Sequence, residues 1–328
     1  MNKLLFFLFL FTVISCSSGQ SYTEYASDPV NLKQHISQLA SAEFGGRKTG
    51  EKGQKLAAAY LAKYYSDLKL EAPAGYEDYL QHIPVEFFNG RSKDKGENVL
   101  AFIKGSKYPE EVLVVSAHYD HLGTKGEDIY FGADDDASGN AALMEIARLF
   151  QKAKTEGKQP ERSILFLHVC GEEIGLFGSK YYTSHPVFPL QKTVVNLNVD
   201  MVGRIDDKHK NDPDYVYLIG SDKLSRELHD LSEKINKETV NLELDYTYNN
   251  ENDPNRYYYR SDHYNFAMNN IPVIFYFNGT HEDYHKPTDT EDKINYDALS
   301  KRTNLIFYTA WEIANRKERI VVDDKKLK

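Results

Sequence analysis

Cysteine is scarce in this chain: only Cys16 and Cys170 occur among its 328 residues. The residues before Cys16 indicate that this cysteine is lipidated. Cys170 then has no partner for an internal disulfide, and the fold must be stabilised by packing. After residue 20 the chain also lacks any apolar run long enough to cross a bilayer. No membrane-spanning helix is therefore predicted in the mature protein.

Clustered positive charge is missing as well. The formal net charge is −9 at pH 7, and the only basic cluster is the extreme C-terminus, residues 325–328, which we interpret as a solvated tail. Because proteins bind nucleic acids largely through clustered Lys and Arg, nucleic acid is not expected as a partner. The length and the share of hydrophobic residues, 41%, suit a globular protein with a sizeable core.

The chain begins with a short apolar run from Leu4 to Ile14, preceded by Lys3. The run is too short for a spanning helix and fits a secretory signal peptide. It ends in Val13-Ile14-Ser15-Cys16, which resembles the lipobox of bacterial lipoproteins, where cleavage leaves a lipidated cysteine. We therefore expect a signal peptide over residues 1–15, and a lipidated Cys16 with a tether over residues 16–28. The lipid would be the only attachment to the membrane of the bacterial cell envelope, an outer membrane with the protein facing the periplasm or the surface.

The rest of the chain alternates between two apolar patterns, without an internal repeat. Helical spacing predicts helices over residues 31–40, 53–68, 137–151, 223–236 and 297–316. Short apolar runs predict strands over residues 98–103, 112–117, 163–169, 194–199, 216–219 and 273–277. Strands that are apolar throughout are typical of a sheet with helices on both faces. We predict one α/β domain over residues 29–328, a three-layer sandwich with a central, mostly parallel twisted sheet.

Three of the predicted strands end in residue types that bind metals. These residues are His118 and Asp120 after strand 112–117, Glu172 and Glu173 after strand 163–169, and Asp200 after strand 194–199. In open α/β sheets, ligands bind beyond the carboxyl ends of the strands, where distant residues converge. A single acidic residue after a strand is usually part of a solvated turn, so it is the coincidence of three that predicts a metal site.

The positions of these residues indicate which of them bind a metal and which support a ligand or face the metal-bound water. His118 and Asp120 lie on the same side of an extended chain, so Asp120 could orient a metal-binding His118; the alternative is a core histidine paired with an aspartate. Glu172 and Glu173 point in opposite directions, so one can bind a metal while the other faces its water. Two exposed glutamates in a turn are the alternative for this pair.

Three consecutive aspartates, Asp134 to Asp136, precede the helix predicted from residue 137. One aspartate is enough to cap a helix N-terminus. The surplus indicates that one of the three bridges two cations through its two carboxylate oxygens.

Residues 281–285, His-Glu-Asp-Tyr-His, match the H-E-x-x-H motif of single-zinc proteases, which works only on a helix. Helix-breaking residues surround the segment, with Asn278-Gly279 before it and Pro287 after it, so we reject this interpretation. His285 remains a candidate ligand, and His281 is expected on the surface or in a pocket wall. The loop over residues 249–260, with three consecutive tyrosines, is predicted to form a pocket wall.

In this order, the motifs resemble the co-catalytic di-zinc aminopeptidase family, whose relatives include glutaminyl cyclases and the transferrin receptor ectodomain. The resemblance covers most of the mature chain, and no single motif is as specific as the ordered set. The matching segments are residues 39–50 (LASAEFGGRKTG), 116–121 (SAHYDH), 132–139 (GADDDASG), 171–179 (GEEIGLFGS), 198–201 (NVDM), 260–263 (RSDH) and 284–290 (YHKPTDT).

The resemblance implies a specific set of zinc ligands. Asp135 would bridge two zinc ions, with His118 and Asp200 completing one site and Glu173 and His285 the other. Cobalt or manganese could occupy the same ligands.

The resemblance also implies roles for residues around the metals. Glu172 would be the general base, Asp120 would support His118, and the Asp135–Asp136 peptide would be cis. Asp136 stands where many family members have Asn.

The function implied is that of an aminopeptidase that hydrolyses the N-terminal residue of peptides through a hydroxide bridging the two metals. Tyr258 and Asp262 are expected to bind substrate, and tyrosines of the 246–259 loop would favour a large apolar or aromatic first residue. The alternatives are a glutaminyl cyclase, a di-zinc carboxypeptidase or deacylase, and an inactive binding module.

Overall fold

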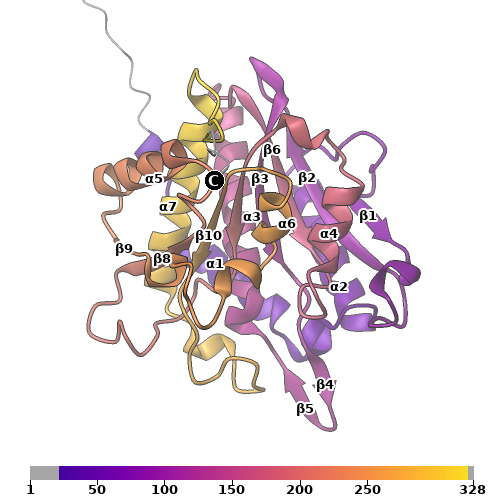
Figure 1. The fold of residues 1–328 in the computed structure, drawn as a ribbon. Coiled ribbons are helices and arrows are strands. Elements are labelled where there is room, and N and C mark those ends of the chain that lie inside the picture. The colour runs from indigo at the N-terminus through magenta and orange to yellow at the C-terminus, as the bar shows by residue number, and fades with distance from the viewer. Residues whose placement is uncertain (1–21, 324–328) are drawn as a thin grey trace, which may run out of the picture.

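An eight-stranded sheet lies between two layers of helices in the computed structural model, which describes residues 22–323 (Figure 1). The strands follow the order β1-β2-β6-β3-β7-β10-β8-β9 across the sheet. Their bounds are β1 Leu80–Ile83, β2 Gly96–Ile103, β3 Tyr108–His118, β6 Arg162–Val169, β7 Thr193–Val199, β8 Tyr215–Ile219, β9 Glu243–Asp245 and β10 Val273–Phe277. A separate hairpin consists of β4 Gly123–Lys125 and β5 Asp128–Tyr130.

The four central strands, β6, β3, β7 and β10, are parallel to one another. Antiparallel pairing occurs towards the edges, between β1 and β2, β2 and β6, and β10 and β8. The predicted α/β sandwich with a mostly parallel sheet is thus confirmed. Parallel strands align their carboxyl ends, so the residues that follow β3, β6 and β7 meet at the same edge of the sheet.

Both faces of the sheet are buried, as the apolar strands predicted. Along β3, Leu113 and Val115 belong to the larger core cluster, whereas Val112 and Val114 belong to a smaller cluster on the opposite face. Successive side chains of a strand point to opposite faces, so this division shows helices packed on each side. Every residue of β2 and of β6 is buried.

Five of the helices match the predicted ones, and they pack mainly on the face of the larger cluster. They are α1 Pro29–Leu39, α2 Lys52–Asp67, α3 Gly139–Thr155, α5 Arg226–Glu238 and α7 Tyr296–Asn315. Their starts follow from capping: Asp28, Ser225 and Asn295 each accept a hydrogen bond from a backbone N–H of the first turn of α1, α5 and α7.

The elements that the sequence did not reveal are short. They are the helices α4 Phe177–Ser184 and α6 His263–Ala267, the edge strands β1 and β9, and the β4–β5 hairpin. Helices α4 and α6 pack against each other and contribute Tyr182 and Phe266 to the smaller cluster. The two helices, of eight and five residues, make too few turns to show a helical period, and strands of three or four residues are too short to show an alternation.

The start of the domain differs from the prediction. Tyr25 is buried and stacks on Trp311 of α7, with ring centroids 5.8 Å apart, and the Ser27 hydroxyl donates to the Ser300 carbonyl at 3.0 Å. Residues 22–28, placed in the tether by the sequence, therefore pack against the domain. Cys16 and the signal peptide lie outside the described residues. Cys170 is buried and unpaired, and no helix within residues 22–323 is long and apolar enough to cross a membrane.

His168, near the carboxyl end of β6, links this strand to helices α2 and α3 by hydrogen bonds. Its Nδ1–H donates to Asn140 Oδ1 of α3 at 2.5 Å, and its Nε2 accepts from the Tyr65 hydroxyl of α2 at 2.5 Å. The Asn140 amide in turn donates to the carbonyl of His118. Burial lowers the pKa of His168 to about 3, so the ring is neutral at physiological pH.

This burial predicts a loss of stability in mild acid. An unfolded histidine binds a proton below about pH 6.5, whereas folded His168 does so only near pH 3, so its stabilising effect is present above pH 6.5 and declines as the pH falls towards 3. Between pH 7 and pH 5 the free energy of unfolding of the wild type should fall by roughly 2 kcal/mol more than that of His168→Gln. Urea unfolding at both pH values, with a chelator present, measures the difference.

The matched control is His82→Gln, because the His82 side chain is about half exposed. It should follow the wild type. Equal pH dependence of the wild type and His168→Gln would contradict the neutral, buried state of His168.

Candidate metal and active site

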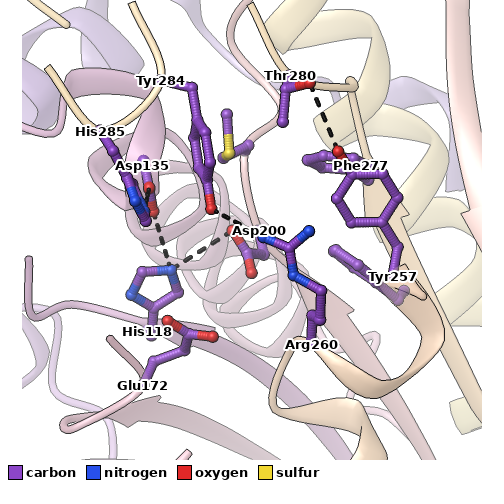
Figure 2. Close-up of a pocket in the computed structure, with 12 residues that line it drawn as sticks. His118, Asp135, Glu172, Asp200, Tyr257, Arg260, Phe277, Thr280, Tyr284 and His285 are labelled. Carbon is purple, nitrogen blue, oxygen red and sulfur yellow. Dashed lines mark hydrogen bonds and ion pairs between the residues drawn. The ribbon is translucent and has the colours of Figure 1, made fainter. Parts of the chain in front are cut away.

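The five predicted ligand side chains converge at the carboxyl edge of the parallel strands, and Figure 2 shows His118, Asp135, Asp200 and His285 of this set. His118 Nε2 lies 3.2 Å from Asp135 Oδ1 and 3.4 Å from Asp200 Oδ1. His285 Nε2 lies 3.1 Å from Asp135 Oδ2 and 3.2 Å from Glu173 Oε2. Asp135 thus stands between two groups of donor atoms, with one oxygen directed to each.

The residues of this cluster fit a metal centre. Imidazole nitrogens and carboxylate oxygens are the donors that zinc binds. Four carboxylates share the site, and no lysine or arginine within residues 22–323 forms an ion pair with any of them; they are Asp135, Glu172, Glu173 and Asp200. Carboxylates gathered in a buried site repel one another unless a cation is present, so the cluster suits bound metal ions.

His118 is the last residue of β3, and the chain fixes its tautomer. Its Nδ1–H donates to the backbone carbonyl of Asp120 at 3.2 Å, while the Asp120 carboxylate is 3.9 Å away. The predicted support by Asp120 therefore acts mainly through its carbonyl, which leaves His118 Nε2 available to a metal. The Asp120 carboxylate accepts hydrogen bonds from the Thr49 hydroxyl at 2.7 Å and from the backbone N–H of Glu172 at 3.2 Å.

The three consecutive aspartates have different partners. Asp134 Oδ1 accepts from the backbone N–H of Gly203 at 2.7 Å, and Asp136 Oδ1 accepts from that of Met201 at 3.0 Å. Only the middle residue, Asp135, lines the pocket. The peptide between Asp135 and Asp136 is cis, as the family resemblance implied.

Residues of the segment after β10 contact two of the three consecutive aspartates, Asp134 and Asp135. Asp289 accepts hydrogen bonds from the backbone N–H groups of Asp134 and Asp135 at 3.0 and 3.1 Å. His281 Nε2 lies 3.1 Å from Asp134 Oδ2, and only 3% of its side chain is exposed. The expected surface or pocket-wall position of His281 was therefore wrong. Residues 281–285 form turns and no helix, which confirms the rejection of the single-zinc motif.

Glu172 and Glu173 lie in the turn after β6 and point in different directions. Glu173 faces His285 and His121, whereas Glu172 lines the pocket beside His118 (Figure 2). Burial, followed by the charges of Glu173 and Asp200, raises the pKa of Glu172 well above its usual value, although His118 opposes this. Burial also acts to raise the pKa of Asp135, but hydrogen bonds from His118 and His285 hold it well below the usual value.

Asp200 is oriented by a polar chain that the sequence did not reveal. The Ser261 hydroxyl donates to Asp200 Oδ2 at 2.6 Å, and the Asn198 amide donates to Ser261 Oγ at 2.8 Å. Asp262, expected to bind substrate, is fully buried and accepts from the Ser179 hydroxyl instead of lining the pocket. Burial raises its pKa to about 7.

His121 was missed as a member of the site. Its Nδ1 lies 2.6 Å from Glu173 Oε1 and 3.9 Å from Asp135 Oδ2, and these three side chains form a group whose donor atoms lie within 4.8 Å of one another. The available signal was its place three residues after His118 in the segment S-A-H-Y-D-H.

A small pocket opens beside the metal cluster. Its wall away from the ligands consists of Met201, Tyr257, Arg260, Phe275, Phe277, Thr280 and Tyr284. The assignment of Tyr258 to this wall was wrong. Residues Tyr257–Tyr259 form a 3₁₀ turn, which sends neighbouring side chains in different directions, and Tyr258 packs against His263 with ring centroids 5.5 Å apart.

A second cluster, formed by His209, Glu243 and Asp245, also has the composition of a cation site. The Lys208 ammonium already pairs with Asp245, and His209 Nδ1 lies 2.7 Å from Asp206 Oδ1. One carboxylate of this cluster, Asp245, is thus already paired with a lysine, unlike the carboxylates around Asp135.

The chain is similar to several known proteins. The chain is 28% identical over 307 residues to leupeptin-inactivating enzyme 1 of Streptomyces exfoliatus, an alignment that covers 86% of this chain and 61% of that protein. Of the first curated relatives, it spans between 20% and 61% of their length.

Solved structures show the same fold. BSAP, a zinc aminopeptidase from Bacillus subtilis, matches with a TM-score of 0.68 and 18% identity, covering 91% of this chain and 99% of that one. A glutaminyl cyclase from Porphyromonas gingivalis matches with a TM-score of 0.67 and 16% identity, covering 87% and 98%. The sequence model of peptidase family M28 matches residues 98–310, the part of the chain that carries every proposed metal ligand. The chain belongs to peptidase family M28.

Proposed function

We propose that this protein is a zinc-dependent aminopeptidase that hydrolyses the first peptide bond of substrates with a free N-terminus. One observation carries the proposal: the two oxygens of Asp135 face different histidines, His118 at 3.2 Å and His285 at 3.1 Å. A carboxylate in this position can bridge two cations. Pairs of metal ions roughly 3.5–4 Å apart are typical of aminopeptidases.

The two zinc ions would share Asp135. His118 and Asp200 would complete the first site, and Glu173 and His285 the second. Membership of family M28 and the description of BSAP as a zinc aminopeptidase support both the metal and the reaction.

The chemistry divides between the metal and the chain. Zinc bound here would polarise the scissile carbonyl and increase the acidity of a water molecule. Glu172 lines the pocket beside His118, where its carboxylate can take a proton from the attacking water and deliver it to the leaving amine. The apolar wall of Tyr257, Phe275 and Phe277 would accept the first side chain of the substrate.

Glutaminyl cyclase activity is the main alternative, because the fold matches structures of both enzyme classes about equally well. The second group of donors, Glu173 and His285, favours the peptidase, since a peptidase of this kind uses two metals. A peptide that begins with Gln separates the two activities: a cyclase releases ammonia and leaves the peptide bonds intact.

A panel of aminoacyl p-nitroanilides tests the proposed reaction directly. We expect the zinc-loaded protein to release nitroaniline from substrates with a free amine. N-acetylated versions of the same substrates should react at least about 100-fold more slowly, because the free amine is expected to bind within the metal cluster. Equal rates on blocked and free substrates would overturn the aminopeptidase assignment.

Replacing the proposed base separates metal binding from turnover. Glu172→Gln should reduce kcat by about 100-fold to 10,000-fold, the usual contribution of a general base, while the protein still binds two zinc ions per chain. Metal content by mass spectrometry and initial rates on the best substrate measure the two effects. Glu127→Gln, an exposed residue in the turn between β4 and β5, is the control and should match the wild type. Loss of zinc together with activity in Glu172→Gln would contradict the role of the base.

We also propose that the mature protein is held at the bacterial cell envelope by a lipid on Cys16, because Val13-Ile14-Ser15-Cys16 resembles a lipobox. In cells that produce the full chain, the wild type should fractionate with membranes and incorporate radiolabelled palmitate. Cys16→Ser should do neither, with Cys170→Ser as the control. Label on the Cys16→Ser protein would contradict the proposed anchor.

A further inference from the structure

The pocket wall contains a single arginine. Arg260 lies opposite the metal ligands among aromatic residues, and its guanidinium carbon lies 4.9 Å from the centroid of the Tyr257 ring. Figure 2 shows this guanidinium directed into the pocket, between Tyr257 and Tyr284. Stacking on an aromatic face holds a guanidinium in one plane and leaves the donors at its edge accessible.

The donors of Arg260 have weak partners within the described part of the chain. One amino group donates to the Asn255 carbonyl at 3.5 Å and the other to the Tyr284 hydroxyl at 3.4 Å, both at the outer limit of a hydrogen bond. No carboxylate among residues 22–323 forms an ion pair with it. Arg204, by contrast, binds Asp283 at 2.8 Å.

The carboxylates of the same pocket have other partners. Asp200 accepts from Ser261 through one oxygen and faces His118 with the other, and Asp135 faces His118 and His285. Arg260 therefore contributes a positive charge that is not neutralised by the protein, next to the place where the first residue of a substrate would lie. A guanidinium matches a carboxylate with two parallel hydrogen bonds.

We infer that Arg260 binds a carboxylate of the substrate and makes the enzyme selective for peptides that carry one close to the scissile bond. This inference rests on the proposed function. Two kinds of peptide provide such a group: those with an acidic first side chain, and dipeptides, whose terminal carboxylate lies one residue beyond the bond. The aromatic wall contacts the aliphatic part of either substrate. The tyrosines of the 246–259 loop predicted only a preference for a large apolar or aromatic first residue. The inference adds a substrate carboxylate as a second feature that determines which peptides bind.

Binding to the zinc-loaded Glu172→Gln protein tests this selectivity without turnover. Calorimetry compares two matched pairs, Glu-Leu-amide with Gln-Leu-amide, and Leu-Leu with Leu-Leu-amide. The carboxylate member of at least one pair should bind about tenfold more tightly, and the ratio should shrink at high salt, because Arg260 is exposed to solvent. The pair that shows the ratio identifies the source of the carboxylate.

Arg260→Met, which keeps a chain able to pack on Tyr257, should reduce that ratio to about one. Arg256→Met is a matched control, because Arg256 stacks on Tyr259 at the same distance of 4.9 Å but does not line the pocket. It should preserve the ratio. Thermal melting checks that both variants are folded.

The inference is overturned if neither pair shows a preference, or if Arg260→Met weakens both members of a pair equally. Failure of the proposed function would give a different result: the zinc-loaded wild type would cleave no peptide of the panel, whatever the binding ratios are.

Discussion

The repulsion among buried carboxylates around Asp135 is the constraint on which the site depends. Asp135 is 3% exposed and lies in a cluster with three other acidic side chains, which are Glu172, Glu173 and Asp200. Within residues 22–323 these four carboxylates form no ion pair with lysine or arginine, and the acidic side chains here are held by neutral hydrogen-bond donors: backbone N–H groups bind Asp134 and Asp136, and Ser261 binds Asp200. Because neutral donors do not remove the charge of a carboxylate, the cluster keeps a net negative charge and suits cations.

The N-terminal motif supports this cluster from a distance, which explains its place in the family pattern. Arg47 is completely buried and donates to four backbone carbonyls, among them those of Tyr119 and Gly132. These two residues begin the segments that carry Asp120 and the three aspartates. Thr49 of the same motif donates to Asp120. Arg47 and Thr49 thus hold segments that lie more than seventy positions later in the chain and carry residues of the site.

The sequence was sufficient for the central sheet, the five long helices and the ligand cluster, because each left a repeated physical signal. Apolar runs such as residues 112–115 of β3 require burial on both faces, and acidic residues after several parallel strands must meet at one edge. It was insufficient for contacts that depend on backbone direction over one or two residues. The choice between Tyr257 and Tyr258 depends on a single 3₁₀ turn, and the contact of His121 with Glu173 depends on the course of the chain after β3.

The segment R-S-D-H shows why a short motif can be specific without all of its residues performing one task. Ser261 orients the ligand Asp200, Asp262 is buried against Ser179, and His263 stacks on Phe275 of β10, which lines the pocket. Three successive residues therefore connect the metal cluster, helix α4 and the apolar wall. Arg260, at the start of the segment, is the one residue whose side chain remains exposed in the pocket with only weak protein partners. The contacts of Ser261, Asp262 and His263 hold the backbone next to Arg260, and the Tyr257 ring lies against its guanidinium, so this charge is placed beside the metal site. A charge placed in this way can discriminate between substrates.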